Sequence, residues 1–139
     1  MNGSAASCKA LRWALTHAAR TGNSVRAIMA TPSEVKWVPA RSTGGEPQAD
    51  TPGYFHLGHG LHHAVKQVRA TLDNAPPVTE VTVVGDASTT LALESRRADL
   101  LVIGSHGHSR LSDVALGSVS TYCVRFSACP VVIVPTADS

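Results

Sequence analysis

The sequence is poor in aromatic residues, in net charge and in long apolar runs. Aromatic side chains make up 4% of the 139 residues, so aliphatic side chains must build the core. The 12 lysines and arginines nearly balance the 10 acidic residues, whereas nucleic-acid binding normally needs a strongly basic surface. There is no run of about eighteen apolar residues that would span a membrane, and no apolar signal-peptide region at the amino terminus. These absences argue against a nucleic-acid-binding protein and against a membrane protein.

Cysteine is also scarce. The chain has an odd number of cysteines, Cys8, Cys123 and Cys129, and no CxxC motif of the kind that binds zinc. Cys123 and Cys129 fall on a predicted helix and at its exit, a placement that does not favour a bridge between them. We therefore expect reduced thiols, buried in the case of these two, in a soluble cytoplasmic protein.

What the sequence does contain is a regular alternation of helices and strands. Hydrophobic residues make up 43% of the chain, which suits one globular domain over residues 1–139. The spacing of apolar residues predicts helices at 4–20, 55–72, 88–97 and 118–127, and strands at 25–30, 78–84, 99–103 and 131–134. The last two strands are continuously apolar, as in a parallel sheet covered on both faces. We predict an α/β fold of this kind, with a long flexible loop at 33–53.

The stretch "IGSHGHSRLSDVALGS" gathers three glycines directly after an apolar strand. In open parallel sheets, ligands bind beyond the carboxyl ends of the strands, where Gly104 stands. Gly117 and Ser118 stand where the next helix starts, and a helix start attracts anions such as phosphate. Gly107 would let the backbone approach such a ligand, and the hydroxyls of Ser118 and Ser120 could donate to it. From these residues alone, a surface loop with Ser118 as an ordinary cap is an equally good interpretation.

The spacing Gly104-x2-Gly107-x9-Gly117-Ser118 resembles the nucleotide-binding motif of the universal stress proteins. The flanks "ADLLVIGSHGHS" and "LGSVSTYCVRFSACPVVIVP" resemble that family too. So do "NGSAASCKALRWALTHAARTG", which matches its first helix, and "VVGDAS", which matches its third strand and turn. The resemblance covers residues 2 to 135 and is weakest in the long loop.

This resemblance implies an adenine-nucleotide-binding α/β domain, usually dimeric, that acts in stress adaptation. The implied ligand is ATP, with or without Mg²⁺, and cyclic AMP is the alternative. Ala30 falls where the family's backbone meets adenine, and the last strand, Val131–Val134, falls where partners pair in a homodimer. The nucleotide-binding positions that follow from the resemblance and the glycine run are Ala30, Ile103, Gly104, Gly107, His108, Arg110, Gly117, Ser118, Val119 and Ser120.

The chain departs from the family pattern at its amino terminus. Many members have an aspartate where this sequence has Asn2, which keeps an oxygen but loses the charge. Members also have an apolar strand before the Asn2-Gly3-Ser4 turn, in the middle of the sheet, and here the sequence begins at the turn. Three outcomes are open: the neighbouring strands pair directly, another chain fills the slot, or the natural protein is longer. We expect the first, which gives one four-stranded sheet.

Other candidate sites are weaker. His56, His59, His62 and His63 share a helix, but no cysteine or carboxylate is placed to complete a metal site, so we predict none. Trp13 is expected to pack.

The sequence also gives little support for an enzymatic function. The chain lacks GxxxxGKS and GxxxxGKT motifs, and Asp113 is the only carboxylate in the glycine run. We expect a regulatory nucleotide-binding protein and not an enzyme. A member that acts only through protein contacts and a weak ATPase are the alternatives.

Overall fold

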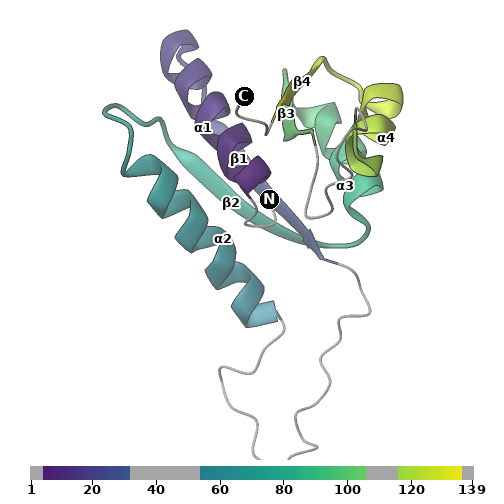
Figure 1. Ribbon diagram of the computed structural model, residues 1–139, viewed down its shortest axis with the longest axis horizontal. Coiled ribbons are helices and arrows are strands. Elements are labelled where there is room, and N and C mark those ends of the chain that lie inside the picture. The colour runs from purple at the N-terminus through teal and green to yellow at the C-terminus, as the bar shows by residue number, and fades with distance from the viewer. Residues whose placement is uncertain (1–4, 32–53, 106–115, 136–139) are drawn as a thin grey trace, which may run out of the picture.

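The fold is known from a computed structural model, which describes residues 5–31, 54–105 and 116–135, with side chains from residue 60 onward in the second range (Figure 1). Helices and strands alternate, as the sequence predicts. Their order is α1 (Ala5–Thr21), β1 (Val25–Thr31), α2 (Tyr54–Arg69), β2 (Val78–Val84), α3 (Ala87–Glu94), a 3-10 turn (Ser95–Arg97), β3 (Leu101–Gly104), α4 (Ser118–Phe126) and β4 (Val131–Val134). The predicted flexible loop at 33–53 and residue 4, where the first helix was expected to begin, lie outside the described residues.

Local sequence signals account for where several elements begin and end. Gly22, which follows α1, has φ +76°, a left-handed conformation that glycine adopts without strain and that commonly ends a helix. Asp86 caps α3, because its carboxylate accepts a hydrogen bond from the backbone N–H of Thr89 at 3.0 Å. The sequence analysis did not identify this cap.

The four strands form two parallel pairs. β1 pairs with β2 from Val25↔Val78 to Thr31↔Val84, and β3 pairs with β4 from Leu101↔Val131 to Gly104↔Val134. Within the described ranges these are two separate two-stranded sheets. The α/β class with parallel strands is therefore confirmed, but the sheet is split.

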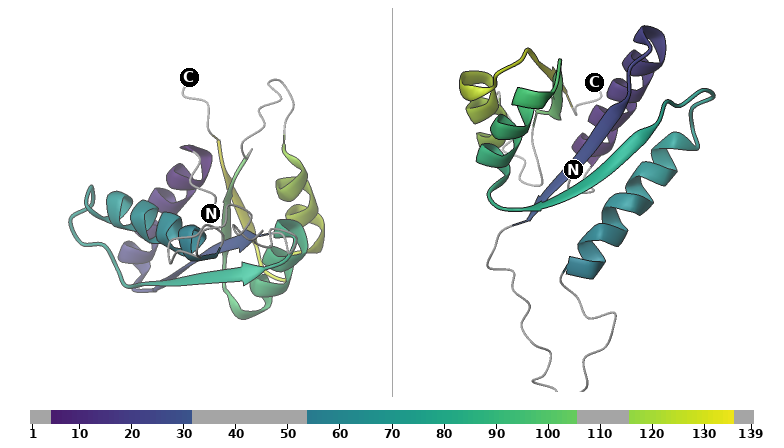
Figure 2. Two further views of the ribbon diagram at one scale, coloured as in Figure 1. Left: turned by 90° about the horizontal axis from the view of Figure 1, so that it is seen from below. Right: turned by 180° about the vertical axis from the view of Figure 1, so that it is seen from behind.

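The expectation that the two inner strands pair directly is wrong. The β1–β2 and β3–β4 pairs run in different directions (Figure 2), and crossed strands cannot share a hydrogen-bond ladder. Helix α1 packs mainly on β3 and less on β1, whereas α2 and α3 pack on β1. A gap between β1 and β3 remains.

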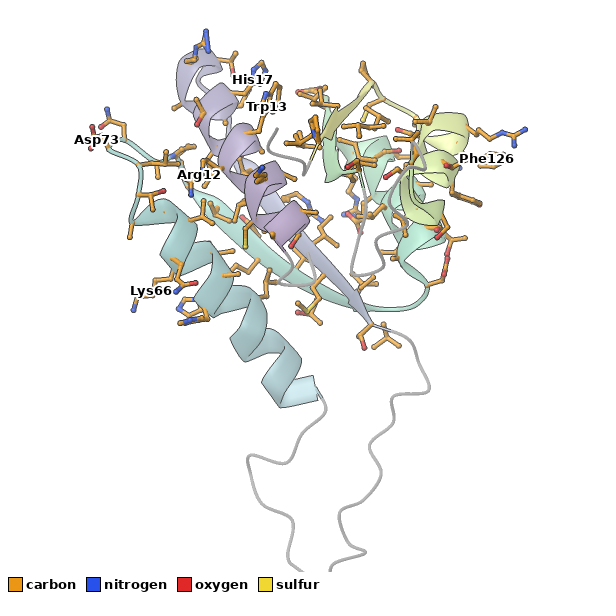
Figure 3. All side chains as sticks on the ribbon, in the orientation of Figure 1. Arg12, Trp13, His17, Lys66, Asp73 and Phe126 are labelled. Atoms are coloured by element: carbon orange, nitrogen blue, oxygen red, sulfur yellow. The ribbon has the colours of Figure 1, made fainter. Side chains whose placement is uncertain are left out.

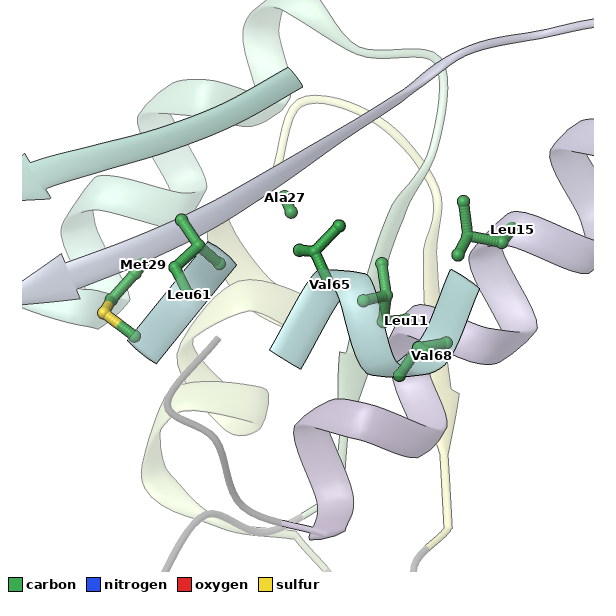
Figure 4. Close-up of a cluster of buried hydrophobic side chains, with 7 residues drawn as sticks. All are labelled: Leu11, Leu15, Ala27, Met29, Leu61, Val65 and Val68. Carbon is green, nitrogen blue, oxygen red and sulfur yellow. The ribbon is translucent and has the colours of Figure 1, made fainter. Parts of the chain in front are cut away.

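Each sheet has its own core. The larger one lies between β1, α1 and α2 (Figure 4) and consists of Leu11, Leu15, Ala27, Met29, Leu61, Val65 and Val68. The smaller one, between β3, β4 and α4, is centred on Leu101, Ile103 and Cys123. Helix α1 contacts α2 and both β3 and β4, so it is the main bridge between the two halves.

The cysteines are unbridged, as expected. Cys123 is fully buried, while Cys8 and Cys129 are half-buried, so the expectation of two buried thiols holds fully for Cys123 alone. Burial raises the pKa of the Cys123 thiol above its ordinary value of 9.0. Among the described helices, none is long and apolar enough to cross a bilayer.

Candidate functional site

A groove of about 1030 Å³ separates the two sheets. β1 and β3 form its walls, α1 lies along one side, α3 along the other, and the start of α4 closes one end. Neither β2 nor β4 contributes a lining residue. The groove is therefore bounded by the inner edge of each sheet.

The groove brings together residues that are far apart in the sequence. Of the ten nucleotide-binding positions expected from the sequence, those that the structure describes all line this one cavity: Ala30, Ile103, Gly104, Gly117, Ser118, Val119 and Ser120. Gly107, His108 and Arg110 lie outside the described residues, as does Asn2. Ala30 lies near the end of β1, Ile103 and Gly104 lie in β3, and the other four lie at the start of α4, so both sheets contribute to this groove.

Hydrogen bonds hold the two ends of the glycine run together. The backbone N–H of Gly117 donates to the Ser105 carbonyl at 2.8 Å. The Ser120 hydroxyl donates to the carbonyls of Gly104 and Ser105 at 2.9 and 3.2 Å. The end of β3 and the first turn of α4 are thus fixed side by side.

Gly104 also allows the first turn of α1 to approach the end of β3. A Cβ atom on Gly104 would lie 2.8 Å from the Cβ of Ala6 and 3.0 Å from its carbonyl oxygen. Glycine is required here because the first turn of α1 occupies the space of any side chain. The close approach explains Gly104 as a packing position as well as a strand end.

The first turn of α4 is suited to an anion. α4 has 9 residues, and its N-cap, Gly117, contributes no side-chain cap. The first N–H groups of a helix have no partner within the helix, and the helix dipole places partial positive charge there. Ser118 is exposed at this point and adds a hydroxyl donor. Phosphate is a common ligand of such a helix start.

Ser120 takes a different part from the one expected. Its side chain is 2% exposed, and its hydroxyl donates within the protein to the end of β3. The structure therefore gives it a positioning role, and Ser118 is the serine whose hydroxyl faces solvent at the helix start. Sequence alone does not separate the two, because they lie two residues apart on the same turn.

The sequence analysis missed one residue of the groove, His17, and misjudged another, Trp13. Trp13 and His17 stack with ring centroids 5.0 Å apart and an interplanar angle of 13°. Both line the groove, on the side of α1 that faces β3 and β4 (Figure 3). Trp13 was expected to pack but is 37% exposed. Their spacing of four, one helical turn, is the signal that could have paired them.

No group of histidine, cysteine and acidic side chains suited to a metal occurs among the described residues. His62 lies 3.0 Å from a carboxylate oxygen of Glu80, which links α2 to β2 on the surface. The side chains of His56 and His59, and all of His106 and His108, lie outside the described part.

Taken together, the parallel strands, the covering helices and the groove that reaches the start of α4 define an α/β protein with a crevice between its two sheets. The model of the universal stress protein family matches residues 1–135. The chain therefore belongs to the universal stress protein family.

The relatives are longer than this chain. Universal stress protein PHOS34 of Arabidopsis thaliana is 31% identical over 93% of this chain and 57% of its own length. Universal stress protein Rv2623 of Mycobacterium tuberculosis is 38% identical over 60% of this chain and 29% of its own length. The chain thus spans little more than half of the first relative.

Solved structures share the fold. A universal stress protein in complex with cAMP has a TM-score of 0.60 at 27% identity and covers 99% of this chain and 93% of its own. The protein MJ0577 has a TM-score of 0.69 at 20% identity, covering 94% and 88%. UspA from Lactobacillus plantarum has a TM-score of 0.64 at 21% identity, covering 91% and 87%. The last two establish the fold alone.

Proposed function

We propose that this protein binds an adenine nucleotide at the end of the groove formed by Ala30, Gly104 and the start of α4. The observation that carries the proposal is the convergence of Ala30 with Gly104, Gly117 and Ser118 on one cavity, from segments more than seventy residues apart. The phosphates would lie at the first turn of α4, against Ser118 and the N–H groups there. The adenine ring would lie against the backbone at Ala30.

The choice of nucleotide rests on two different supports. The family resemblance favours ATP, held with or without Mg²⁺. The structure at 27% identity contains cAMP, which makes cyclic AMP the competing ligand. Both ligands carry phosphate and adenine, so both fit a site with an anion-binding helix start at one end.

The bound nucleotide serves regulation in the stress response, and the protein is not a catalyst. This part of the proposal rests on the sequence, where Asp113 is the only carboxylate in the glycine run and no phosphate-clamping lysine motif occurs. The unbridged cysteines favour the cytoplasm. The apolar strand β4, paired on one edge with β3 among the described residues, is the edge through which we expect a homodimer.

Isothermal titration calorimetry with ATP and with cAMP, each with and without Mg²⁺, tests the proposal. The informative variant is Gly117→Val, whose side chain would fill the space in front of α4. Gly117 has φ −78° and ψ 177°, extended values that valine adopts readily, so the fold should survive. We expect at least a tenfold loss of affinity.

The matched control is Val124→Ala, at an exposed position on the same helix. It should bind as the parent does. A parent protein that binds neither nucleotide, or a Gly117→Val variant that binds as tightly as the parent, would contradict the proposal. Release of inorganic phosphate from ATP at a rate dependent on the protein would contradict the non-catalytic part.

A further inference from the structure

Helices α1 and α2 carry positive charge and no negative charge. Their basic residues are Lys9, Arg12 and Arg20 in α1 and Lys66 and Arg69 in α2, and neither helix contains an aspartate or a glutamate. The whole chain, with 12 basic and 10 acidic residues, is close to neutral. The overall balance therefore conceals one strongly basic part of the molecule.

The two helices form one layer of the molecule, the α1–α2 layer. They pack against each other and lie on the same side of the β1–β2 sheet (Figure 2), where their inner faces build the larger core. Figure 3 shows Lys66 on the flank of α2 that is turned away from α1, Arg12 between the two helices, and Trp13 on the flank of α1 toward β3 and β4. The charge is therefore spread across the layer and not confined to one stripe.

Four of these side chains form what we call the basic face: Arg12, Arg20, Lys66 and Arg69. All of them are exposed except Arg69, which is half-buried. Arg12 donates a hydrogen bond at 2.9 Å to the hydroxyl of Thr71, a neutral group that fixes the guanidinium without neutralising it. A guanidinium has several N–H donors, more than this one bond uses. Arg26, outside the α1–α2 layer, is instead paired with the Glu94 carboxylate at 2.6 Å. The basic face can therefore donate to an anionic ligand.

Helix stability accounts for only part of this charge pattern. Arg20 lies in the last turn of α1, and Lys66 and Arg69 lie in the last turn of α2, where positive charge offsets the helix dipole. This effect fades within the last turn, and Arg12 lies in the middle of α1. The dipole also favours acidic residues in the first turns, and neither helix has one there. The excess of positive charge therefore has a further cause.

The acidic residues of the described ranges lie mostly away from this layer. They are Asp73, Glu80, Asp86, Glu94 and Asp99. The last three belong to α3 and to the approach to β3, on the other side of the β1–β2 sheet (Figure 2). Glu80 reaches the layer at its edge, where it lies 3.0 Å from His62, and Asp73 follows the end of α2 (Figure 3). These two border residues leave the layer with a clear surplus of positive charge.

A bilayer that contains anionic lipids is the partner that suits this arrangement. Its surface is planar, and its attraction for basic residues falls off within a Debye length, about 10 Å at 0.1 M salt. A helix packed on a sheet already places the far side of that sheet more than about 10 Å away, so the acidic residues there oppose docking little. Trp13, which is 37% exposed at the border of the layer, has the amphipathic ring that favours a membrane interface.

Nucleic acid is the other polyanion to consider, and the shape of the layer does not favour it. A duplex groove admits one protruding helix or a two-stranded ribbon. Here α1 and α2 lie side by side and together present a broad surface (Figure 1). A planar partner contacts both helices at once.

We propose that the α1–α2 layer docks peripherally on an anionic phospholipid surface through the basic face. The guanidinium and ammonium groups bind the phosphate and carboxylate groups of the lipids, and Trp13 enters the headgroup region at one border. Such docking is reversible and weakens with salt, because it rests on charge. It does not depend on the proposed nucleotide binding, since no residue of the basic face lines the groove.

Co-sedimentation with lipid vesicles, in the absence of nucleotide, tests the proposal. One set of vesicles is phosphatidylcholine alone, and the other contains about 30% phosphatidylserine as the anionic lipid. At about 0.1 M salt we expect the protein to bind the anionic vesicles and not the neutral ones. Raising the salt to about 0.5 M should lower the partition coefficient at least tenfold.

The informative variant combines Arg12→Gln with Lys66→Gln, which removes two charges and keeps side chains that favour a helix. It should lower the partition coefficient on anionic vesicles at least tenfold. The matched control combines Arg96→Gln with Arg125→Gln, two exposed arginines outside the layer, and changes the net charge equally. It should bind as the parent does.

A second pair, Arg20→Gln with Lys66→Gln, leaves the hydrogen bond between Arg12 and Thr71 intact. It should show the same loss of binding, which separates the effect of charge from that of the bond. Urea unfolding followed by circular dichroism checks that all variants are folded, and their midpoints should stay within about 0.5 M of the parent.

Three results would overturn the proposal. One is equal binding to neutral and anionic vesicles, or no binding to either. Another is an equal loss in the control pair, which would show that net charge matters and its position does not. The third is an RNA of mixed sequence that displaces the anionic vesicles from the parent at equal phosphate concentration, which would assign the basic face to nucleic acid.

Discussion

Replacing Gly104 by alanine tests how the fold positions the site, because it adds a single methyl group at the meeting point of β3 and α1. The new Cβ would lie 2.8 Å from the Cβ of Ala6, 3.0 Å from its carbonyl oxygen and 3.1 Å from its carbonyl carbon. Carbon atoms in contact prefer about 3.5–4.0 Å, so one element must move by roughly 1 Å. The atoms in the way include helix backbone, which cannot rotate aside as the end of a long side chain can.

Overpacking of this kind typically costs about 1–3 kcal/mol. With a urea dependence of roughly 2 kcal/mol per molar for a domain of this size, the midpoint of unfolding should fall by about 0.5–1.5 M. The slope of the transition should stay the same, since the change affects the folded state and not the area exposed on unfolding. Circular dichroism during urea titration measures both quantities.

Gly60→Ala is the matched control. Gly60 lies in α2, is exposed, and has no atom within 4 Å of the position of an added Cβ. Alanine is favoured over glycine in a helix by roughly 0.5–1 kcal/mol, so this variant should be slightly more stable than the parent. If Gly104→Ala were as stable as the parent while Gly60→Ala behaved as expected, the result would contradict the close contact between α1 and β3.

Two further predictions concern assembly and pH. Val132→Lys, on the half-buried strand β4, should convert dimers to monomers in light scattering. The control Val124→Lys, at an exposed site on α4, should leave the mass unchanged. An unchanged mass for Val132→Lys would show that β4 is not part of the dimer interface. Burial raises the pKa of the Cys123 thiol, so the stability that it contributes should be fully present below pH 9.0 and be lost as the pH rises through the higher pKa of the folded state. Cys123→Ala should lessen the fall in the urea midpoint above pH 9.0, and an unchanged fall would show that another group is responsible.

The sequence predicted the order of helices and strands well because each has a clear local signal. The periodic apolar residues of α1 and the unbroken run Val131–Val134 are examples, and β2 begins and ends where expected. The same local signals do not show which strands pair with each other. Whether β1 pairs with β3 depends on how α1 and α3 hold each strand, and the direct pairing that we expected did not occur.

The candidate site, too, could be predicted from the sequence only in part. The glycine spacing and the family resemblance selected residues that the fold does gather at one groove, from Ala30 to Ser118. They could not show that the Ser120 hydroxyl bonds to the end of β3, nor that Ala6 is the reason for Gly104. Trp13 and His17 were missed as a pair because side-chain exposure depends on the open gap that they face.

The central claim is that an adenine nucleotide binds where β1, β3 and the start of α4 meet. The most direct test is to titrate the ¹⁵N-labelled protein with ATP and with cAMP and to follow the backbone amide signals by NMR. The account predicts saturable changes concentrated at Ala30, Gly104, Ser118 and Val119, with little change at Val65 and Val68 in the larger core. Saturable changes centred elsewhere, or no change with either nucleotide, would contradict it.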